Sequence, residues 1–128
     1  MQGLRWALVL ALGVYQPALA AKQPDLEKAI TLARMTLDTY LADYPSARFQ
    51  DVRAGHPPRN GDYVTFCGAI NARNQAGSYS GWEGFVLVVS GGKGRLYLAG
   101  RDALLVDTLC NTKLVSIPGD HAAALAHP

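Results

Sequence analysis

The sequence predicts a single α+β domain, in which an N-terminal amphipathic helix and a short C-terminal helix pack on a three- or four-stranded antiparallel sheet with one disulfide. Three observations predict this fold class. Apolar residues recur at helical spacing near the start, later segments rich in β-branched and aromatic residues are separated by glycine-rich turns, and the chain contains two cysteines. Such an order of elements is typical of a two-layer domain whose helices cover one sheet face.

The first twenty residues are predicted to be a cleaved signal peptide. Arg5 precedes an apolar run from Trp6 to Val14, and Ala18-Leu19-Ala20 forms a small-residue exit. The apolar run is much shorter than the roughly 20 residues that a membrane-spanning helix needs, although an uncleaved anchor is the alternative. We therefore expect cleavage after Ala20 and a mature protein in the periplasm or outside the cell, without a membrane span.

The remaining chain has the length of one domain, which we place at residues 21–118, followed by a flexible, alanine-rich tail at residues 119–128. Removal of Arg5 lowers the count of basic residues from 12 to 11 against 10 acidic residues, a net charge of +1. The basic residues lie singly along the chain, whereas a nucleic-acid binder concentrates them in a patch. No nucleic-acid partner is expected.

A helix is predicted from Pro24 to Ala42. Its apolar residues recur at steps of three and four positions: Leu26, Ala29, Ile30, Ala33, Leu37, Tyr40 and Leu41. Asp25 favours the positive end of the helix dipole. The helix is expected to end near Asp43, because Pro45 disfavours helical dihedral angles in the residue before it.

Strand and turn signals follow the helix. Residues 48–53 can alternate in a strand with a bulge or short break, and residues 55–61 are a loop because they contain two prolines and two glycines. Residues 63–71 are rich in β-branched and aromatic residues and predict a second strand. Residues 82–89 and 95–99 predict an antiparallel hairpin, because the glycine-rich turn between them is short.

A second, shorter helix is predicted to start at Asp102, which can cap its first turn. Its buried side comprises Leu104, Leu105, Val106 and Leu109. A strand over residues 103–109 is the alternative. Cys110 would lie near the end of this element, and no helix or strand is predicted in the tail.

Cys67 and Cys110 are predicted to form the disulfide, since an even pair of cysteines in an exported chain is usually bonded. Closing the loop between them removes roughly 4 kcal/mol of unfolded-state entropy. A redox pair or a metal site is the alternative. It is disfavoured because the chain has no Cys-x-x-Cys motif and two distant cysteines are too few for a closed zinc site. We expect no metal and no cofactor.

The most informative stretch runs from Phe66 to Trp82 and has the sequence FCGAINARNQAGSYSGW. It resembles a group of small exported bacterial proteins of unknown function with the pattern Cys-Gly-x-(Ile/Val)-Asn-x-(Lys/Arg)-Asn-x-x-Gly-x-Tyr-x-Gly-aromatic. In that group a Pro-x-Ser-Ala-(Lys/Arg)-Phe-x-x-Val segment precedes the pattern, which residues 44–52 resemble, and a late cysteine follows it, as Cys110 does here. This chain departs at Ala69, where an acidic residue is usual. The resemblance implies a shared fold and no particular activity.

Two interpretations of this stretch stay open. In the structural one, its glycines permit unusual backbone angles while Asn71 and Asn74 bond to nearby backbone and hold a turn. In the functional one, five side chains form an exposed surface able to stack on a sugar or to bind a protein: Asn71, Arg73, Asn74, Tyr79 and Trp82.

No catalytic constellation is evident, so we expect a noncatalytic domain that binds a protein or another envelope component. The alternative is a small envelope hydrolase that uses Glu83, paired with Asp62 or Asp102, or a histidine. The three histidines, His56, His121 and His127, have no evident partner for nucleophilic or acid–base catalysis and are expected on the solvated surface. A purely structural secreted protein is the third possibility.

Overall fold

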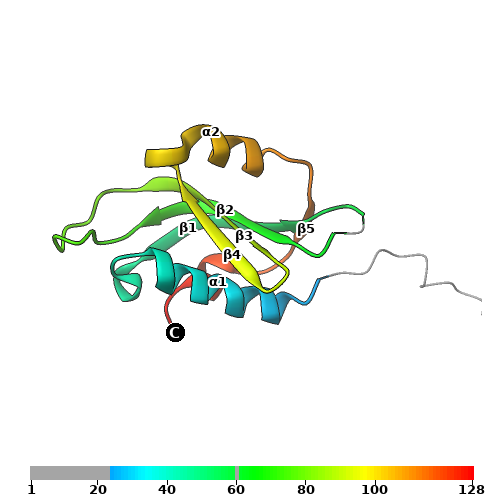
Figure 1. Cartoon of the computed structure of the whole chain (residues 1–128), viewed down its shortest axis with the longest axis horizontal. Coiled ribbons are helices and arrows are strands. Elements are labelled where there is room, and N and C mark those ends of the chain that lie inside the picture. The colour runs from blue at the N-terminus through cyan, green and yellow to red at the C-terminus, as the bar shows by residue number, and fades with distance from the viewer. Residues whose placement is uncertain (1–23, 60) are drawn as a thin grey trace, which may run out of the picture.

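A five-stranded antiparallel sheet with the strand order β4-β3-β2-β1-β5 forms the centre of the chain (Figure 1). The computed structural model describes residues 24–59 and 61–128, so the predicted signal peptide lies outside the described residues. The elements in chain order are α1 (Leu26–Tyr40), the 3-10 turn η2 (Tyr44–Ser46), β1 (Arg48–His56), β2 (Val64–Asn71), β3 (Glu83–Ser90), β4 (Lys93–Leu98), α2 (Ala99–Cys110), β5 (Val115–Ile117) and α3 (His121–Leu125).

The predicted α+β class is confirmed, and the sheet has one strand more than the three or four expected. The additional strand, β5, is three residues long and pairs with the end of β1 through Ala54–Ile117, Gly55–Ser116 and His56–Val115. Its sequence is too short to show strand alternation. Among the described helices, none is long and apolar enough to span a membrane.

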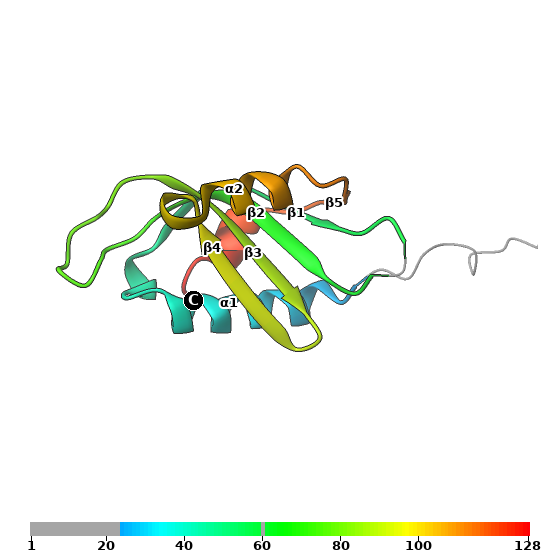
Figure 2. The same cartoon turned by 45° about the horizontal axis from the view of Figure 1, so that its top comes forward.

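The helices cover both faces of the sheet, so the expectation that they share one face is wrong (Figures 1 and 2). One core cluster joins α1 and α3 to Phe85 and Leu87 of β3, while a smaller cluster joins Val106 of α2 to Val86 on the opposite face. Successive side chains of a strand point to opposite faces. Strand β3 carries apolar side chains on both of its faces, so each face of the sheet offers a surface on which a helix can pack.

Helix α1 begins after Asp25, whose side chain accepts a hydrogen bond from the backbone N–H of Lys28 at 3.2 Å. It ends at Tyr40, two residues before the predicted limit. The predicted stripe buries Ala29, Ala33 and Leu37, whereas Tyr40 is half exposed. The stripe therefore defines the buried side correctly except in the last turn.

Strand β1 contains the predicted irregularity. The register shifts between Gln50 and Arg53, and Asp51 adopts a φ of 54°, as in a β-bulge. On the neighbouring strand, a Cβ atom at Gly68 would lie 2.9 Å from the Cα atom of Val52, so the bulge approaches β2 at a position that requires glycine. Beyond the bulge β1 continues to His56, which is two residues into the predicted loop.

The C-terminal tail predicted to be flexible is folded instead. Leu125 of α3 is fully buried in the main core. Arg34 Nε donates to the carbonyl oxygen of Ala124 at 2.8 Å, and the hydroxyl of Tyr44 donates to the carbonyl oxygen of Leu125 at 2.5 Å. These contacts come from residues about eighty to ninety positions earlier in the chain, so the composition of residues 119–128 does not reveal them.

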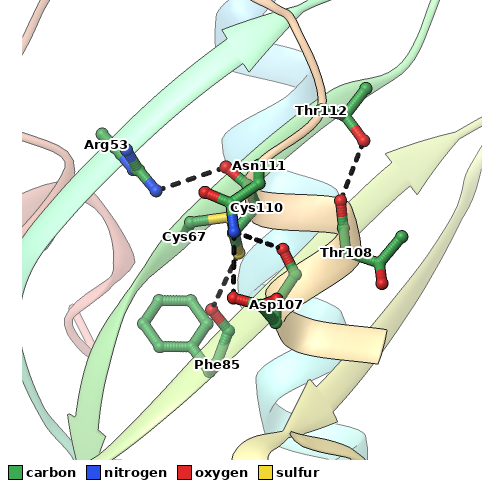
Figure 3. The surroundings of a disulfide bond; sticks show 8 residues. All are labelled: Arg53, Cys67, Phe85, Asp107, Thr108, Cys110, Asn111 and Thr112. Atoms are coloured by element: carbon green, nitrogen blue, oxygen red, sulfur yellow. Dashed lines mark hydrogen bonds between the residues drawn. A yellow bond between two sulfur atoms is a disulfide. The ribbon is translucent and has the colours of Figure 1, made fainter. Parts of the chain in front are cut away.

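The predicted disulfide is confirmed: Cys67 of β2 is bonded to Cys110 at the end of α2, with a Cα–Cα distance of 5.9 Å and a sequence separation of 43 (Figure 3). It lies beside Val86 and Val106 in the smaller core cluster. Arg53 Nη2 donates to the carbonyl oxygen of Cys110 at 3.3 Å, which joins β1 to the same corner. The bridge therefore holds α2 on its sheet face, where Val106 is the only buried residue of the helix.

Helix α2 starts at Ala99, earlier than the predicted start at Asp102, and the alternative strand over residues 103–109 is wrong. Asp102 has non-helical dihedral angles (φ −125°, ψ 50°) and forms a kink between a first turn and the main helix. The residue predicted as the cap therefore lies at the non-helical position where the main part of the helix begins. Leu104 remains 79% exposed and Leu105 37% exposed, so only part of the predicted apolar side is buried.

Candidate functional site

The loop between β2 and β3, residues 72–82, projects beyond one end of the sheet (Figures 1 and 2). It extends the β2–β3 ladder, because Arg73 and Tyr79 form an antiparallel bridge. Its tip is a tight turn in which the N–H of Gly77 donates to the carbonyl oxygen of Asn74 at 2.9 Å and the N–H of Asn74 donates to that of Ser78 at 2.8 Å. Gly77 has a φ of 83°, a conformation that favours glycine. The loop is thus an ordered hairpin.

Asn71 and Asn74 hold the backbone of this β2–β3 loop. The Oδ1 atom of Asn74 accepts hydrogen bonds from the N–H groups of Ala76 at 2.9 Å and Ser78 at 3.2 Å. The Oδ1 atom of Asn71 accepts one from the N–H of Gly81 at 3.1 Å. These contacts are the backbone bonds that the structural interpretation expects of asparagine in a turn.

Ser46 connects the β2–β3 loop to the start of β1. Its carbonyl oxygen accepts a hydrogen bond from the hydroxyl of Tyr79 at 3.1 Å, and its Oγ accepts one from the N–H of Arg73 at 3.2 Å. The Ser46 hydroxyl itself donates to the carbonyl oxygen of Asp43 at 2.8 Å. The two sequence segments of the motif, residues 44–52 and 66–82, therefore meet at one end of the sheet. Sequence reasoning did not include Ser46 in the site, because its contacts are 27 and 33 positions away.

Two arginines lie against the ring of Tyr79. The guanidinium carbon of Arg48 is 4.6 Å from the ring centroid and that of Arg73 is 5.3 Å from it. Both arginines are exposed, while Tyr79 is partly buried. These distances are within the range of cation–π attraction, so each arginine is held near the ring.

The five residues predicted as a binding surface thus divide by their contacts. Asn71, Asn74 and Tyr79 bond to backbone within or next to the loop. Arg73 presents its guanidinium group to solvent, and Trp82 is 47% exposed. All five belong to the loop or its first flanking residue, so the structure brings them to one end of the molecule.

Glu83, the predicted catalytic carboxylate, lies at the start of β3. Its Oε2 accepts a hydrogen bond from the N–H of Gly100 at 2.7 Å, at the first turn of α2. Asp62 lies near Ser90, the last residue of β3, where the hydroxyl oxygen is 3.5 Å from Asp62 Oδ1. The length of β3 separates the two acids by roughly 20 Å. The structure therefore does not bring Glu83 and Asp62 together, which removes one of the two acid pairs that the hydrolase alternative allowed.

The expectation that the histidines are solvated is wrong for His56 and His121, which are 6% and 3% exposed. His56 Nδ1 lies 2.8 Å from the carbonyl oxygen of Pro57, and His121 Nε2 lies 2.7 Å from that of Ile117. A ring nitrogen at this distance from a carbonyl oxygen donates its N–H to it, so each of the two rings is fixed to the backbone within the protein interior. His127 is exposed and its ring contacts the edge of Tyr44 at a centroid distance of 4.9 Å.

Burial raises the pKa of Tyr44, an effect that the nearby guanidinium of Arg34 opposes and the carboxylate of Asp38 reinforces. This tyrosine binds α3 rather than facing the β2–β3 loop. Within residues 24–59 and 61–128, no three His, Cys, Asp or Glu side chains gather in a way that could hold a metal ion.

Clefts lie beside the sheet in more than one place. One of about 590 Å³ lies between the start of α1 and the β3–β4 turn, where Lys28, Asp62 and Gly91 contribute to its wall. Another, of about 450 Å³, lies beside the disulfide and includes Arg53 and Asp107. The first is at the end of the sheet opposite the β2–β3 loop, so the loop residues do not line it.

Comparisons with family models, with curated proteins and with solved structures found no match to the chain. The resemblance to small exported bacterial proteins stays a prediction.

Proposed function

We propose that the mature chain is a noncatalytic exported domain that captures a protein or another envelope component through the β2–β3 loop. The observation that carries this proposal is that the loop projects from the sheet and yet has its backbone fixed. The side-chain oxygens of Asn71 and Asn74 accept hydrogen bonds from backbone N–H groups of the loop, and the hydroxyl of Tyr79 bonds the loop to Ser46. A fixed loop loses little conformational freedom on binding, so more of the contact energy appears as affinity.

The scaffold beneath the loop supports the same role. Binding residues are commonly placed on loops that a rigid framework positions. Here the loop emerges from the two central strands β2 and β3, and the disulfide joins β2 to α2. A disulfide also fits an oxidising compartment outside the cytoplasm, in agreement with the predicted signal peptide.

The exposed side chains of the loop are of the types that dominate binding energies. Trp, Tyr and Arg are enriched among the residues whose truncation weakens protein interfaces most. Trp82 is 47% exposed and no hydrogen bond of its indole group is found within the described residues. Arg73 is exposed beside Tyr79. Together they offer a partner one large apolar surface and one charge.

The contacts of the predicted catalytic groups favour a noncatalytic role over the hydrolase alternative. Glu83 is bonded to the backbone of α2, and His56 and His121 donate to carbonyl oxygens. A general base needs a free lone pair within reach of the proton it removes. The remaining ring nitrogens of His56 and His121 are buried away from a substrate, and the Glu83 carboxylate is engaged with the first turn of α2.

Photo-crosslinking in the envelope tests the proposal. A photoreactive residue is placed at the exposed Gln75 in the tip of the loop. The matched control is the exposed Lys93, the first residue of β4, which pairs with Ser90 at the opposite end of β3. We expect an adduct of defined mass from position 75 and none from position 93. Mass spectrometry identifies the partner, which is then purified for binding measurements.

Trp82→Ala is the variant that tests the role of the side chain. We expect it to weaken binding of the purified partner by about ten- to a hundred-fold, as for a central aromatic contact. Met35→Ala serves as the control, because it truncates another exposed large side chain, 61% exposed on α1, that has no part in the β2–β3 loop. Equal adducts at positions 75 and 93, or no adduct at position 75, would contradict the proposed function.

A further inference from the structure

Arg48 and Arg73, which we call the arginine pair, present two guanidinium groups at the base of the β2–β3 loop. Both lie against the same ring, at 4.6 Å and 5.3 Å from the centroid of Tyr79. Among the described residues, neither guanidinium group donates a hydrogen bond to a protein acceptor or forms an ion pair; the one bond of Arg73 to Ser46 uses its backbone N–H. The charged N–H groups of the arginine pair are therefore available to a ligand.

The positions of the arginine pair are fixed by the surrounding contacts. Arg48 pairs with Asn71 across the β1–β2 ladder, and Arg73 pairs with Tyr79 in the loop bridge. Tyr79 is held in turn by its hydroxyl bond to Ser46. A long arginine side chain normally loses much freedom when it binds. Stacking against a fixed ring removes part of that freedom before the ligand arrives, which favours binding.

Asp43, whose carbonyl oxygen accepts a hydrogen bond from Ser46, lies at the same end of the molecule, but among the described residues no ion pair joins its carboxylate to either member of the arginine pair. No acidic residue occurs from Tyr63 to Trp82. Glu83 follows, and its carboxylate is bonded to the N–H of Gly100. Asp51 lies in the bulge of β1 and, with Arg53, lines the cleft beside the disulfide. The charge of the arginine pair is thus complementary to an anionic partner.

The geometry favours carboxylates of a protein over an anionic membrane. Binding to anionic lipid surfaces depends on clusters of about four to eight Lys or Arg residues. Here two arginines stand together, and the mature chain has a net charge of only +1 with its other basic residues dispersed. Arginine presents a planar fork of donors that matches a carboxylate in a bidentate manner.

We propose that the arginine pair binds carboxylate side chains in an acidic segment of the protein that the β2–β3 loop captures. This inference rests on the proposed function and specifies the class of its partner. Arg48 comes from β1 and Arg73 from the loop, so the recognition site includes a strand that the sequence motif alone did not assign to the binding surface.

Crosslinking from position 75 tests the inference in the exported protein. The measurement compares the protein that keeps all its arginines with two variants. One is Arg48→Gln/Arg73→Gln, and the other is Arg95→Gln, a control at an exposed arginine of β4. We expect the adduct with the same partner to fall by about ten- to a hundred-fold in the first variant, as for lost hydrogen bonds to a charged group, and to persist in the control. Arg48→Lys/Arg73→Lys keeps both charges without the fork and should give an intermediate value.

The outcomes separate this inference from the proposed function. Absence of any adduct from position 75 when both arginines are present refutes the proposed function. An undiminished adduct in Arg48→Gln/Arg73→Gln leaves the proposed function standing and refutes the role of the arginine pair. Amide NMR spectra of the purified variant establish that the loop keeps its fold; if Tyr79 loses its position, Arg73→Gln alone replaces the double variant.

A titration with a defined probe gives a second, independent measurement. We expect hexaglutamate to shift the NMR signals of the Arg48 and Arg73 side chains and of Tyr79, and hexaglutamine at the same concentration to leave them unchanged. The shifts should weaken with added salt, because the contact is an exposed charge interaction. Equal shifts with both peptides would overturn the inference. Saturable binding of the same residues to phosphatidylglycerol vesicles, without a response to hexaglutamate, would assign the site to a membrane instead.

Discussion

Gly94 of β4 offers a direct test of how α1 packs on the sheet. A Cβ atom at this position would clash with the Oγ1 atom of Thr36 and would lie 3.0 Å from its Cβ and 3.3 Å from its Cγ2. Thr36 is buried on α1, where its hydroxyl donates to the carbonyl oxygen of Leu32 at 2.7 Å. Rotation of the threonine brings another heavy atom toward the same place, because its Cβ is branched. Gly94→Ala is therefore accommodated only if α1 and β4 move apart.

The expected cost of Gly94→Ala is about 2 to 3 kcal/mol, the upper part of the range for overpacked cores. Thr36→Ala alone should cost about 1 kcal/mol, through a lost methyl contact and a lost local hydrogen bond. In the double variant the alanine at position 36 no longer has the Oγ1 and Cγ2 atoms. Its destabilisation should therefore be smaller than the sum of the single effects by about 1 kcal/mol or more.

Equilibrium urea denaturation followed by circular dichroism measures these free energies of unfolding. Gly84→Ala is the matched control, because a Cβ atom at Gly84 in β3 would have its nearest neighbour at an ordinary 3.7 Å. This control should change the free energy of unfolding by about 0.5 kcal/mol or less. Gly94→Ala as harmless as the control, or strictly additive effects in the double variant, would refute the proposed packing of α1 against β4.

Three further predictions concern the disulfide and the C-terminal helix. Reduction of the bond between Cys67 and Cys110 should lower the free energy of unfolding by about 4 kcal/mol in urea titrations; two thiols titrating in the native, nonreduced protein would contradict this. Leu125→Ala should cost about 3 kcal/mol, because the side chain is fully buried, whereas deletion of the exposed Pro128 should cost almost nothing. Burial raises the pKa of Tyr44, so its stabilising effect is complete below about pH 10 and is lost as the pH rises through the folded-state value. Tyr44→Phe should cost about 1 kcal/mol at neutral pH and remove this part of the alkaline loss, and an unchanged dependence of the free energy of unfolding on pH above about pH 10 would contradict it.

Local signals predicted the elements near their observed positions. The stripe of α1, the run of β-branched residues in β2 and the glycine turn between β3 and β4 each depend on neighbours a few positions away. The bulge in β1 was also predicted, because Phe49 and Val52 do not share one strand face without an extra residue. The candidate site was predicted in part: the five residues gather at the β2–β3 loop, but Ser46 and Arg48 were not assigned to it.

The wrong predictions concern residues and helices whose surroundings are determined by residues far away in the sequence. His121 and Leu125 lie in a segment of low complexity, and their burial depends on Phe66, Arg34 and Tyr44. The sheet face that each helix covers depends on the alternation in β3, which is apolar on both sides and therefore compatible with helices on either.

The sequence by itself determined the α+β class, the helix stripe, the hairpin of β3 and β4 and the pairing of the only two cysteines, because periodicity, turn residues and covalent chemistry act over short distances or by elimination. Tertiary structure alone decided that α3 folds, that the helices divide between two faces and that Arg48 joins Arg73 at the ring of Tyr79. Packing energy comes from contacts between residues far apart in the chain, and no local pattern encodes which of them meet.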